Sequence, residues 1–193
     1  KQVTHQGIPM VIARMGYSRE LCYELFLQDG SKGNDLWELL WEAGQEFKIS
    51  AGGPNIILRL EGGILSYLAD IDRSNNPYEV GLDWLVDLEQ EDDFIGKEAL
   101  RLVSQNGPTK KLMGAEIHGD PIADSNADHW PVFINGKKVG SMNAMVYSPR
   151  LDKNICYTIL DIEHAKSGQE IVIAAPEKDL MATTVDLPWR ERA

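Results

Sequence analysis

Six short apolar segments recur through the second half of the chain, and they constrain the fold more than any other feature. Glycine, proline, asparagine and aspartate separate them, most clearly at Asn135-Gly136, a pair typical of a tight β-hairpin. Short apolar runs bounded by such residues indicate strands. About six strands with no helix between them predict an antiparallel barrel or sandwich. The segments are Leu112–Ile117, Val132–Ile134, Val139–Val146, Ile155–Leu160, Ile171–Ala174 and Met181–Leu187.

The first half of the chain mixes strands with helices. We expect a hairpin between Ile8–Ala13 and Leu21–Leu27, joined through Gly16–Arg19. Asp35 and Glu38 have the spacing of a capping box, and apolar residues at helical spacing follow as far as Phe47. Trp37 and Trp41 flank that stripe, and we interpret both as packing residues rather than as ligand-stacking ones.

Two further helices are predicted before the barrel. The first extends from about Asn55 to Ala69 and is apolar nearly all round, so Arg59 and Glu61 within it need partners. We expect helix-anchoring ion pairs there rather than substrate contacts. The second runs over Gly96–Gln105 and ends at Asn106-Gly107-Pro108. The fold class is therefore α+β, with a boundary that divides the chain into residues 1–107 and 108–193.

Glu24 is the most informative single residue. In a strand over Leu21–Leu27 it shares a face with Cys22 and Phe26, while the opposite face is wholly apolar. Such a strand is expected to be covered on both sides. An unpartnered carboxylate there would cost on the order of several kcal/mol, so Glu24 needs a donor from the protein or from a ligand. Arg14 and Arg59 are the internal candidates.

Charge and composition exclude several classes of function. The formal net charge is −11, which argues against nucleic-acid and anionic-membrane partners because both require a basic face. No apolar run approaches the roughly 18 residues of a transmembrane helix, and the N-terminus has no signal-peptide pattern. Cys22 and Cys156 lie in apolar runs and indicate reduced thiols in a cytoplasmic protein, although a disulfide between them stays open.

The sequence also lacks the motifs of several common sites. Gly52-Gly53-Pro54 has no Lys-Ser/Thr, so it is not a phosphate-binding P-loop, and no serine lies in a nucleophile elbow. We predict no metal site, because the four histidines are isolated from one another and from cysteine. The chain starts without a methionine, close to a strand, and we expect it to be a piece of something longer.

Several ordered motifs together resemble the tetrahydrofolate-dependent aminomethyltransferase family, which comprises the glycine cleavage T-protein and its demethylase relatives. The resemblance implies a folate-binding domain ending near residue 107 and a C-terminal β-barrel after it. It also implies that about half of the family's length lies upstream of Lys1, including its catalytic residues, so we expect this stretch alone to be inactive. The motifs are Gly16-Tyr17-Ser18 with Tyr23-Glu24-Leu25, Leu58-Arg59-Leu60-Glu61-Gly62, Pro77-Tyr78-Glu79-Val80-Gly81, Asp93-Phe94-Ile95-Gly96-Lys97-Glu98-Ala99-Leu100, and Tyr147-Ser148-Pro149-Arg150-Leu151.

The resemblance supplies a partner for Glu24. Its carboxylate would accept the adjacent N–H and NH2 groups of a pterin ring as a bidentate pair. Tyr17 would lie at the pocket wall, and Asn55 takes the place of an arginine that contacts folate in the T-protein. The reaction implied is transfer of a one-carbon unit from a small donor to tetrahydrofolate.

Departures from the T-protein pattern favour one branch of the family. Pro54-Asn55 and the ending Val185-Asp186-Leu187-Pro188-Trp189 resemble the dimethylsulfoniopropionate demethylase branch, but Phe26 replaces that branch's tyrosine. We therefore predict demethylation of a small sulfonium, amine or methoxy substrate. One alternative is glycine cleavage with a lipoyl H-protein partner. The other is a non-enzymatic folate-binding relative, although the motif that such relatives carry in the comparable region differs from Ile95-Gly96-Lys97-Glu98 of this chain.

Overall fold

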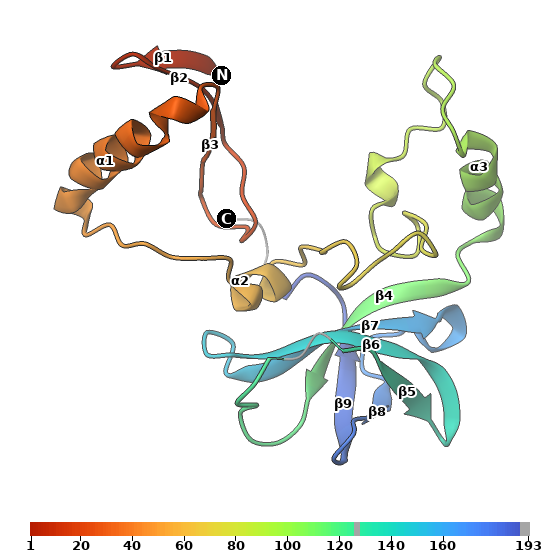
Figure 1. The fold of residues 1–193 in the computed structure, drawn as a ribbon. Coiled ribbons are helices and arrows are strands. Elements are labelled where there is room, and N and C mark those ends of the chain that lie inside the picture. The colour runs from red at the N-terminus through yellow and green to blue at the C-terminus, as the bar shows by residue number, and fades with distance from the viewer. Residues whose placement is uncertain (126–127, 190–193) are drawn as a thin grey trace. The chain divides into compact units, whose positions relative to one another are not determined.

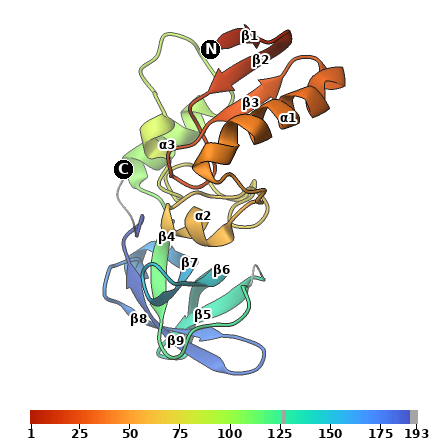
Figure 2. The same cartoon turned by 90° about the vertical axis from the view of Figure 1, so that its left-hand side faces the viewer.

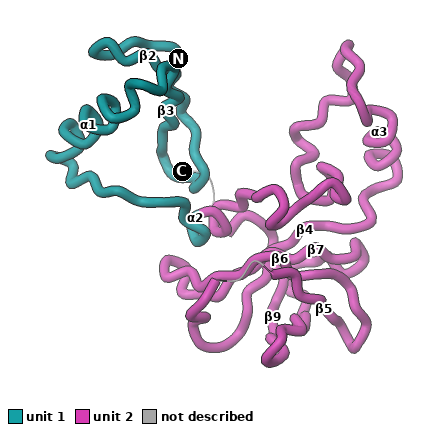
Figure 3. Tube along the Cα trace, viewed as in Figure 1, with its two compact units in different colours: residues 1–58, 192–193 teal, residues 59–191 magenta. Residues whose placement is uncertain are grey.

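The computed structural model describes residues 1–125 and 128–189, and these form two compact units. Unit 1 comprises residues 1–58, and unit 2 begins at Arg59 (Figure 3). The division falls inside the short helix α2 (Ile56–Glu61). The predicted boundary at 107/108 separates two family domains and not two compact units, and it stays a prediction.

Unit 1 contains a three-stranded antiparallel sheet and one helix (Figure 1). The strands β1 (Gln2–His5), β2 (Ile8–Ala13) and β3 (Glu24–Leu27) follow one another in order, so each neighbouring pair is a hairpin. Helix α1 (Gly33–Gly44) lies between the short 3-10 turns Gly30–Lys32 and Gln45–Phe47. Helix α1 lies beside the sheet (Figure 2). Leu36 of this helix forms a buried cluster with Ile8 and Met10 of β2.

Two predictions for unit 1 need correction, and one strand was not predicted. The hairpin between the second and third strands forms, but β3 begins only at Glu24, so Leu21 and Tyr23 lie outside it and are exposed. The capping box is absent, because α1 begins two residues before Asp35 and its N-cap, Lys32, makes no side-chain cap bond. The strand β1 was missed, since its sequence is polar and its residues are mostly exposed.

The first part of unit 2 is mostly loop and short helix. Helix α2 ends at Glu61, whereas the sequence predicted a helix to Ala69. The reason is Gly62-Gly63, where the chain turns with Gly63 at φ +68°, a conformation that glycine adopts without strain. A 3-10 turn at Asp83–Leu85 follows, and α3 (Lys97–Asn106) confirms the predicted third helix.

The remainder of unit 2 is a closed barrel of six antiparallel strands in the order β4-β7-β6-β5-β8-β9, which confirms the predicted α+β class (Figure 1). The turn Asn135-Gly136 joins β5 to β6 with both residues at positive φ, as a type I′ turn requires. Each predicted segment coincides with one strand, although the predicted Met181–Leu187 extends two residues beyond the end of β9. The strands are β4 (Lys110–Ile117), β5 (Trp130–Ile134), β6 (Lys137–Ser148), β7 (Lys153–Asp161), β8 (Glu170–Ala174) and β9 (Asp179–Val185).

Apolar side chains fill the barrel. Its core includes Met113, Val132, Met142, Leu160 and Ile173, all almost completely buried. The strands β6 and β7 approach so closely at Gly140 that a Cβ there would lie 2.0 Å from the Ile159 carbonyl oxygen. The barrel was predictable because its strands contain buried apolar runs, and β7 is buried at every residue from Asn154 to Leu160.

Both cysteines are free, as predicted. Cys156 is buried in β7, and burial raises the pKa of its thiol far above the usual value. Cys22 lies in the loop before β3 rather than inside a strand. Among the described residues, no helix has the length and apolar character needed to span a membrane.

Candidate functional site

Glu24 is the first residue of β3 and lies opposite Ala13 of β2. Side chains alternate along a strand, so Leu25 and Leu27 point toward α1, while Glu24 and Phe26 point to the other face of the sheet. Phe26 is 46% exposed on that face, and Glu24 is half-buried. The expected coverage of the strand on both sides is therefore wrong for unit 1, where α1 covers one face.

The Glu24 carboxylate has no protein partner in the described part of unit 1. No hydrogen bond or ion pair to it is formed there, and Arg14, an internal candidate, is not paired with it. The guanidinium of Arg59, the other candidate, forms an ion pair with Asp70 and donates a hydrogen bond to the Ile64 carbonyl oxygen, both within unit 2. Unit 1 thus presents a half-buried carboxylate that is available to a donor from outside.

Tyr17 lies in the loop between β2 and β3 and is 47% exposed. The loop folds on itself around Cys22, whose Sγ donates to the Glu20 carbonyl oxygen at 3.2 Å and lies 3.8 Å from Ser18 Oγ. A Cβ on Gly16 would lie only 1.9 Å from Cys22 Sγ. Glycine at position 16 is therefore required for this packing, which fixes the chain on either side of Tyr17.

Asn55 has a structural role that the sequence did not predict. Its Oδ1 accepts hydrogen bonds from the backbone N–H groups of Ile57 at 2.9 Å and Leu58 at 3.2 Å. It therefore caps the start of α2, as asparagine commonly does. The amide NH2 group of Asn55 is engaged with no other described residue of unit 1.

The structure confirms that Arg59 and Glu61 are anchored internally, as expected. Besides the Arg59 pair, the Asp70 carboxylate accepts from the Ser66 backbone N–H at 2.6 Å. Ser148 Oγ donates to Glu61 Oε1 at 2.6 Å, and Arg150 Nη1 lies 3.8 Å from Glu61 Oε2. These contacts fasten α2 and the following loop to the barrel strand β6.

Of the three predicted site residues, Tyr17 and Glu24 come from one hairpin and Asn55 from the segment after α1. Within the described chain, no hydrogen bond connects Glu24 or Asn55 to another member of the three. Sequence reasoning missed Ala13, the small residue that lies opposite Glu24 in the β2–β3 register. If the third strand had been predicted to start at Glu24, the hairpin register would have paired Glu24 with Ala13.

This arrangement is suited to binding rather than to covalent chemistry. A half-buried carboxylate between a small residue and an aromatic ring can accept two hydrogen bonds from a flat amino-heterocycle. Among the described residues, no group of three or more His, Cys, Asp or Glu side chains could hold a metal ion.

Comparison with protein families gives two matches that together span most of the chain. Residues 1–90 match the model of the GCVT N-terminal domain, and residues 110–189 match that of the glycine cleavage T-protein C-terminal barrel domain. The second match coincides with the closed barrel.

Individual relatives agree with these matches. The chain is 32% identical over 192 residues to the dimethylsulfoniopropionate demethylase of Ruegeria pomeroyi, covering 98% of this chain and 51% of the relative. It is 33% identical over 195 residues to an aminomethyltransferase of Symbiobacterium thermophilum, covering 98% and 50%. The chain therefore spans about half the length of the curated relatives it matches.

The fold is shared with a solved structure. The glycine cleavage system aminomethyltransferase T of Bartonella henselae superposes with a TM-score of 0.82 at 22% identity, over 97% of this chain and 51% of that one. At this identity the likeness describes the fold.

Proposed function

The chain belongs to the glycine cleavage T-protein family, and from that premise we propose that the protein carrying it transfers a one-carbon unit from a small donor to tetrahydrofolate. The observation that carries the proposal is Glu24, a half-buried carboxylate on an open sheet face with no protein partner in the described part of unit 1. Such a carboxylate has the chemistry to anchor the donor edge of a pterin.

The residues present fit that ligand. Glu24 would accept the ring N–H and the exocyclic NH2 of the pterin, and Ala13 opposite leaves room for a flat ring. Tyr17 would contact the ring from the loop that Cys22 and Gly16 hold in shape. Asn55 uses its carbonyl oxygen to cap α2, so its amide NH2 is the group that would donate to the ligand.

The task of this chain in the reaction is positioning. Tetrahydrofolate supplies the N5 atom that accepts the one-carbon unit. Glu24 would fix the rotation of the ring in its plane. Catalytic groups are proposed to come from a preceding segment, so residues 1–107 would form the C-terminal part of the folate-binding domain and residues 108–193 the barrel domain. The preceding half of the same protein would then be its first partner.

For the donor, we propose a small sulfonium, amine or methoxy compound that is demethylated. Pro54-Asn55 and the ending at Leu187-Pro188-Trp189 support this branch, as does the similarity to a dimethylsulfoniopropionate demethylase. The similarity to aminomethyltransferases is of the same size, which keeps glycine cleavage with an H-protein as the second candidate.

Titration of tetrahydrofolate into the intact protein tests the binding role. Glu24→Gln keeps the shape of the side chain but replaces one acceptor oxygen with a donor. We expect affinity to fall by about tenfold to a hundredfold, since a hydrogen bond to a charged group contributes roughly 1.5–3 kcal/mol. Glu38→Gln on the exposed side of α1 removes the same charge and should leave the affinity unchanged. Equal affinity of the Glu24 variant and the wild type would refute the anchor.

Donor assays distinguish the branches. Formation of methyltetrahydrofolate from a sulfonium, amine or methoxy donor supports the demethylase proposal. Activity that requires glycine and a lipoylated H-protein supports the aminomethyltransferase. Folate binding without transfer from any of these donors would favour a non-enzymatic folate-binding protein.

A further inference from the structure

A pocket at one end of the barrel, formed entirely by unit 2, has the character of a binding site. Its volume is about 320 Å³, which falls within the usual range for small-molecule sites. The lining comes from the β4–β5 connection, the start of β5, strand β6, and the turn and strand that follow β8. None of these residues belongs to the candidate site of unit 1.

The wall of this pocket is apolar and rigidly supported. Met145 is 7% exposed and belongs to the barrel core, while Ile122, Trp130 and Leu180 are partly buried and pack against the same core. Strands and core packing hold the floor of the pocket, which Trp130, Met145 and Leu180 form, while Glu177 reaches it from the turn between β8 and β9.

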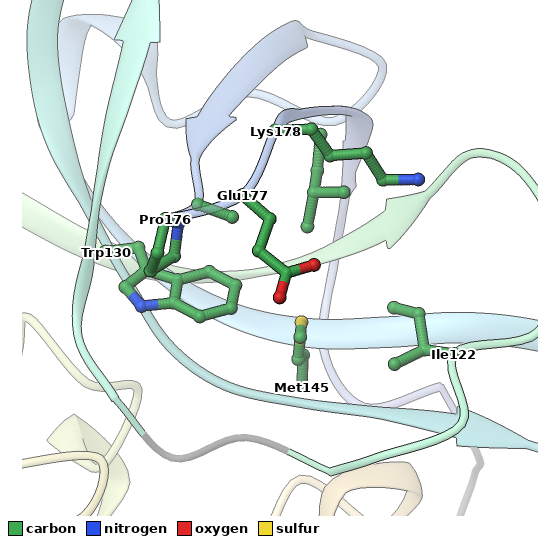
Figure 4. A pocket seen from close by; sticks show the side chains of 8 residues that line it. Ile122, Trp130, Met145, Pro176, Glu177 and Lys178 are labelled. Atoms are coloured by element: carbon green, nitrogen blue, oxygen red, sulfur yellow. The ribbon is translucent and has the colours of Figure 1, made fainter.

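One charge points into this apolar setting. Figure 4 shows the Glu177 carboxylate directed between the indole of Trp130 and the side chain of Ile122, toward the sulfur of Met145. Lys178 follows it in the turn, but its ammonium group extends away from the indole (Figure 4). Within the described residues of unit 2, neither Glu177 nor Lys178 takes part in an ion pair or a side-chain hydrogen bond.

These features select a ligand by charge and shape. Glu177 is an exposed residue whose charge would repel an anion, and a neutral apolar molecule would gain nothing from that charge. A compact organic cation satisfies both parts of the pocket, because its charge faces the carboxylate while its alkyl groups contact the indole face and the methionine. We propose that this pocket binds a small alkylammonium ligand, with Glu177 as its counter-ion and Trp130 as its aromatic wall.

A series of probes that differ in charge tests the proposal on the intact protein. Choline, its neutral isostere 3,3-dimethylbutan-1-ol and the anion 3,3-dimethylbutanoate have similar branched heads. Binding is measured by calorimetry and by the shift of the Trp130 indole N–H resonance, assigned with Trp130→Phe. We expect choline to bind at least about fivefold more tightly than the alcohol, which corresponds to about 1 kcal/mol for a partly exposed cation site.

Variants then locate the effect. Glu177→Gln should weaken choline binding by about fivefold or more, and Trp130→Leu should weaken it similarly. Asp179→Asn is the matched control, because Asp179 is an exposed carboxylate two residues away that does not line the pocket. The proposal is overturned if choline does not bind, if the alcohol binds equally well, or if Asp179→Asn reduces binding as much as Glu177→Gln. Binding of the anion that is lost in Lys178→Gln would overturn it as well.

Discussion

Removal of the Asp70 carboxylate is expected to destabilise unit 2 strongly. The Asp70 side chain is 0% exposed and its partner Arg59 is 7% exposed, so the ion pair is shielded from water. In Asp70→Ala, the Arg59 guanidinium would remain buried with the Ile64 carbonyl oxygen as an acceptor at 3.0 Å, and the Ser66 N–H would lose its acceptor. Breaking a buried pair by removing one partner costs about 3–5 kcal/mol.

Two further variants separate the charge from the hydrogen bonds. Asp70→Asn keeps an oxygen that the Ser66 N–H can reach, so it should cost less than Asp70→Ala. The double variant Arg59→Met/Asp70→Ala removes the orphaned charge, and we expect it to recover a large part of the loss, because paired removal of buried charges is often nearly neutral. A double variant no more stable than Asp70→Ala would mean that packing, and not the buried charge, sets the cost.

The measurement must report on unit 2 alone, because two compact units need not unfold together. Amide hydrogen exchange along β7, together with guanidinium unfolding, meets this condition. Lys137→Ala serves as the control, since its pair with Glu163 is exposed on both sides, and the unfolding midpoint should not change measurably. If Asp70→Ala lowers the free energy of unfolding by less than about 1 kcal/mol, the buried pair contributes no more than a surface pair, and the prediction of strong destabilisation is refuted.

Three other predictions follow from close contacts and burial. Gly16→Ala should weaken folate binding, because the new Cβ would lie 1.9 Å from Cys22 Sγ, and Gly16→Ala/Cys22→Ala should restore part of it in the same titration. Cys156 should resist alkylation in the folded protein at pH 8, since burial raises its thiol pKa, and should react only after unfolding, as mass spectrometry can determine. Gly140→Ala should lower the unfolding midpoint of the barrel, because its Cβ would meet the Ile159 carbonyl oxygen at 2.0 Å, and an unchanged midpoint would contradict that distance.

The barrel could be predicted because every strand carries its own signal. Apolar runs mark the buried faces, and Asn135-Gly136 marks a turn whose positive φ values suit those residues. The helix expected over Asn55–Ala69 failed because Gly63 ends it, and an apolar composition says nothing about such a turn. Sequence patterns thus located most elements but not the polar strand β1, and the ends of the elements depended on backbone conformation.

The candidate site was predictable only in part. The strand pattern identified Glu24 as unusual, and the structure places it on the sheet face opposite α1. The sequence pattern overestimated the burial of Glu24. Phe26, which shares its face, is 46% exposed, and strand periodicity does not say whether another element covers that face. The packing of Cys22 against Gly16, which shapes the Tyr17 loop, is a contact across the loop that strand periodicity does not encode.

The contrast among the carboxylates of this chain supports the ligand role of Glu24. The acidic residues buried in unit 2 each have a protein partner: Glu61 has Ser148 and Arg150, Asp70 has Arg59 and Ser66, and Glu79 accepts from Thr109. These contacts stabilise the unit, so removing them should cost stability. Glu24 is less buried and has no such partner in the described part of unit 1, so Glu24→Gln should leave the stability of unit 1 unchanged while folate affinity falls. A loss of stability in that variant, with unchanged affinity, would make Glu24 a structural residue.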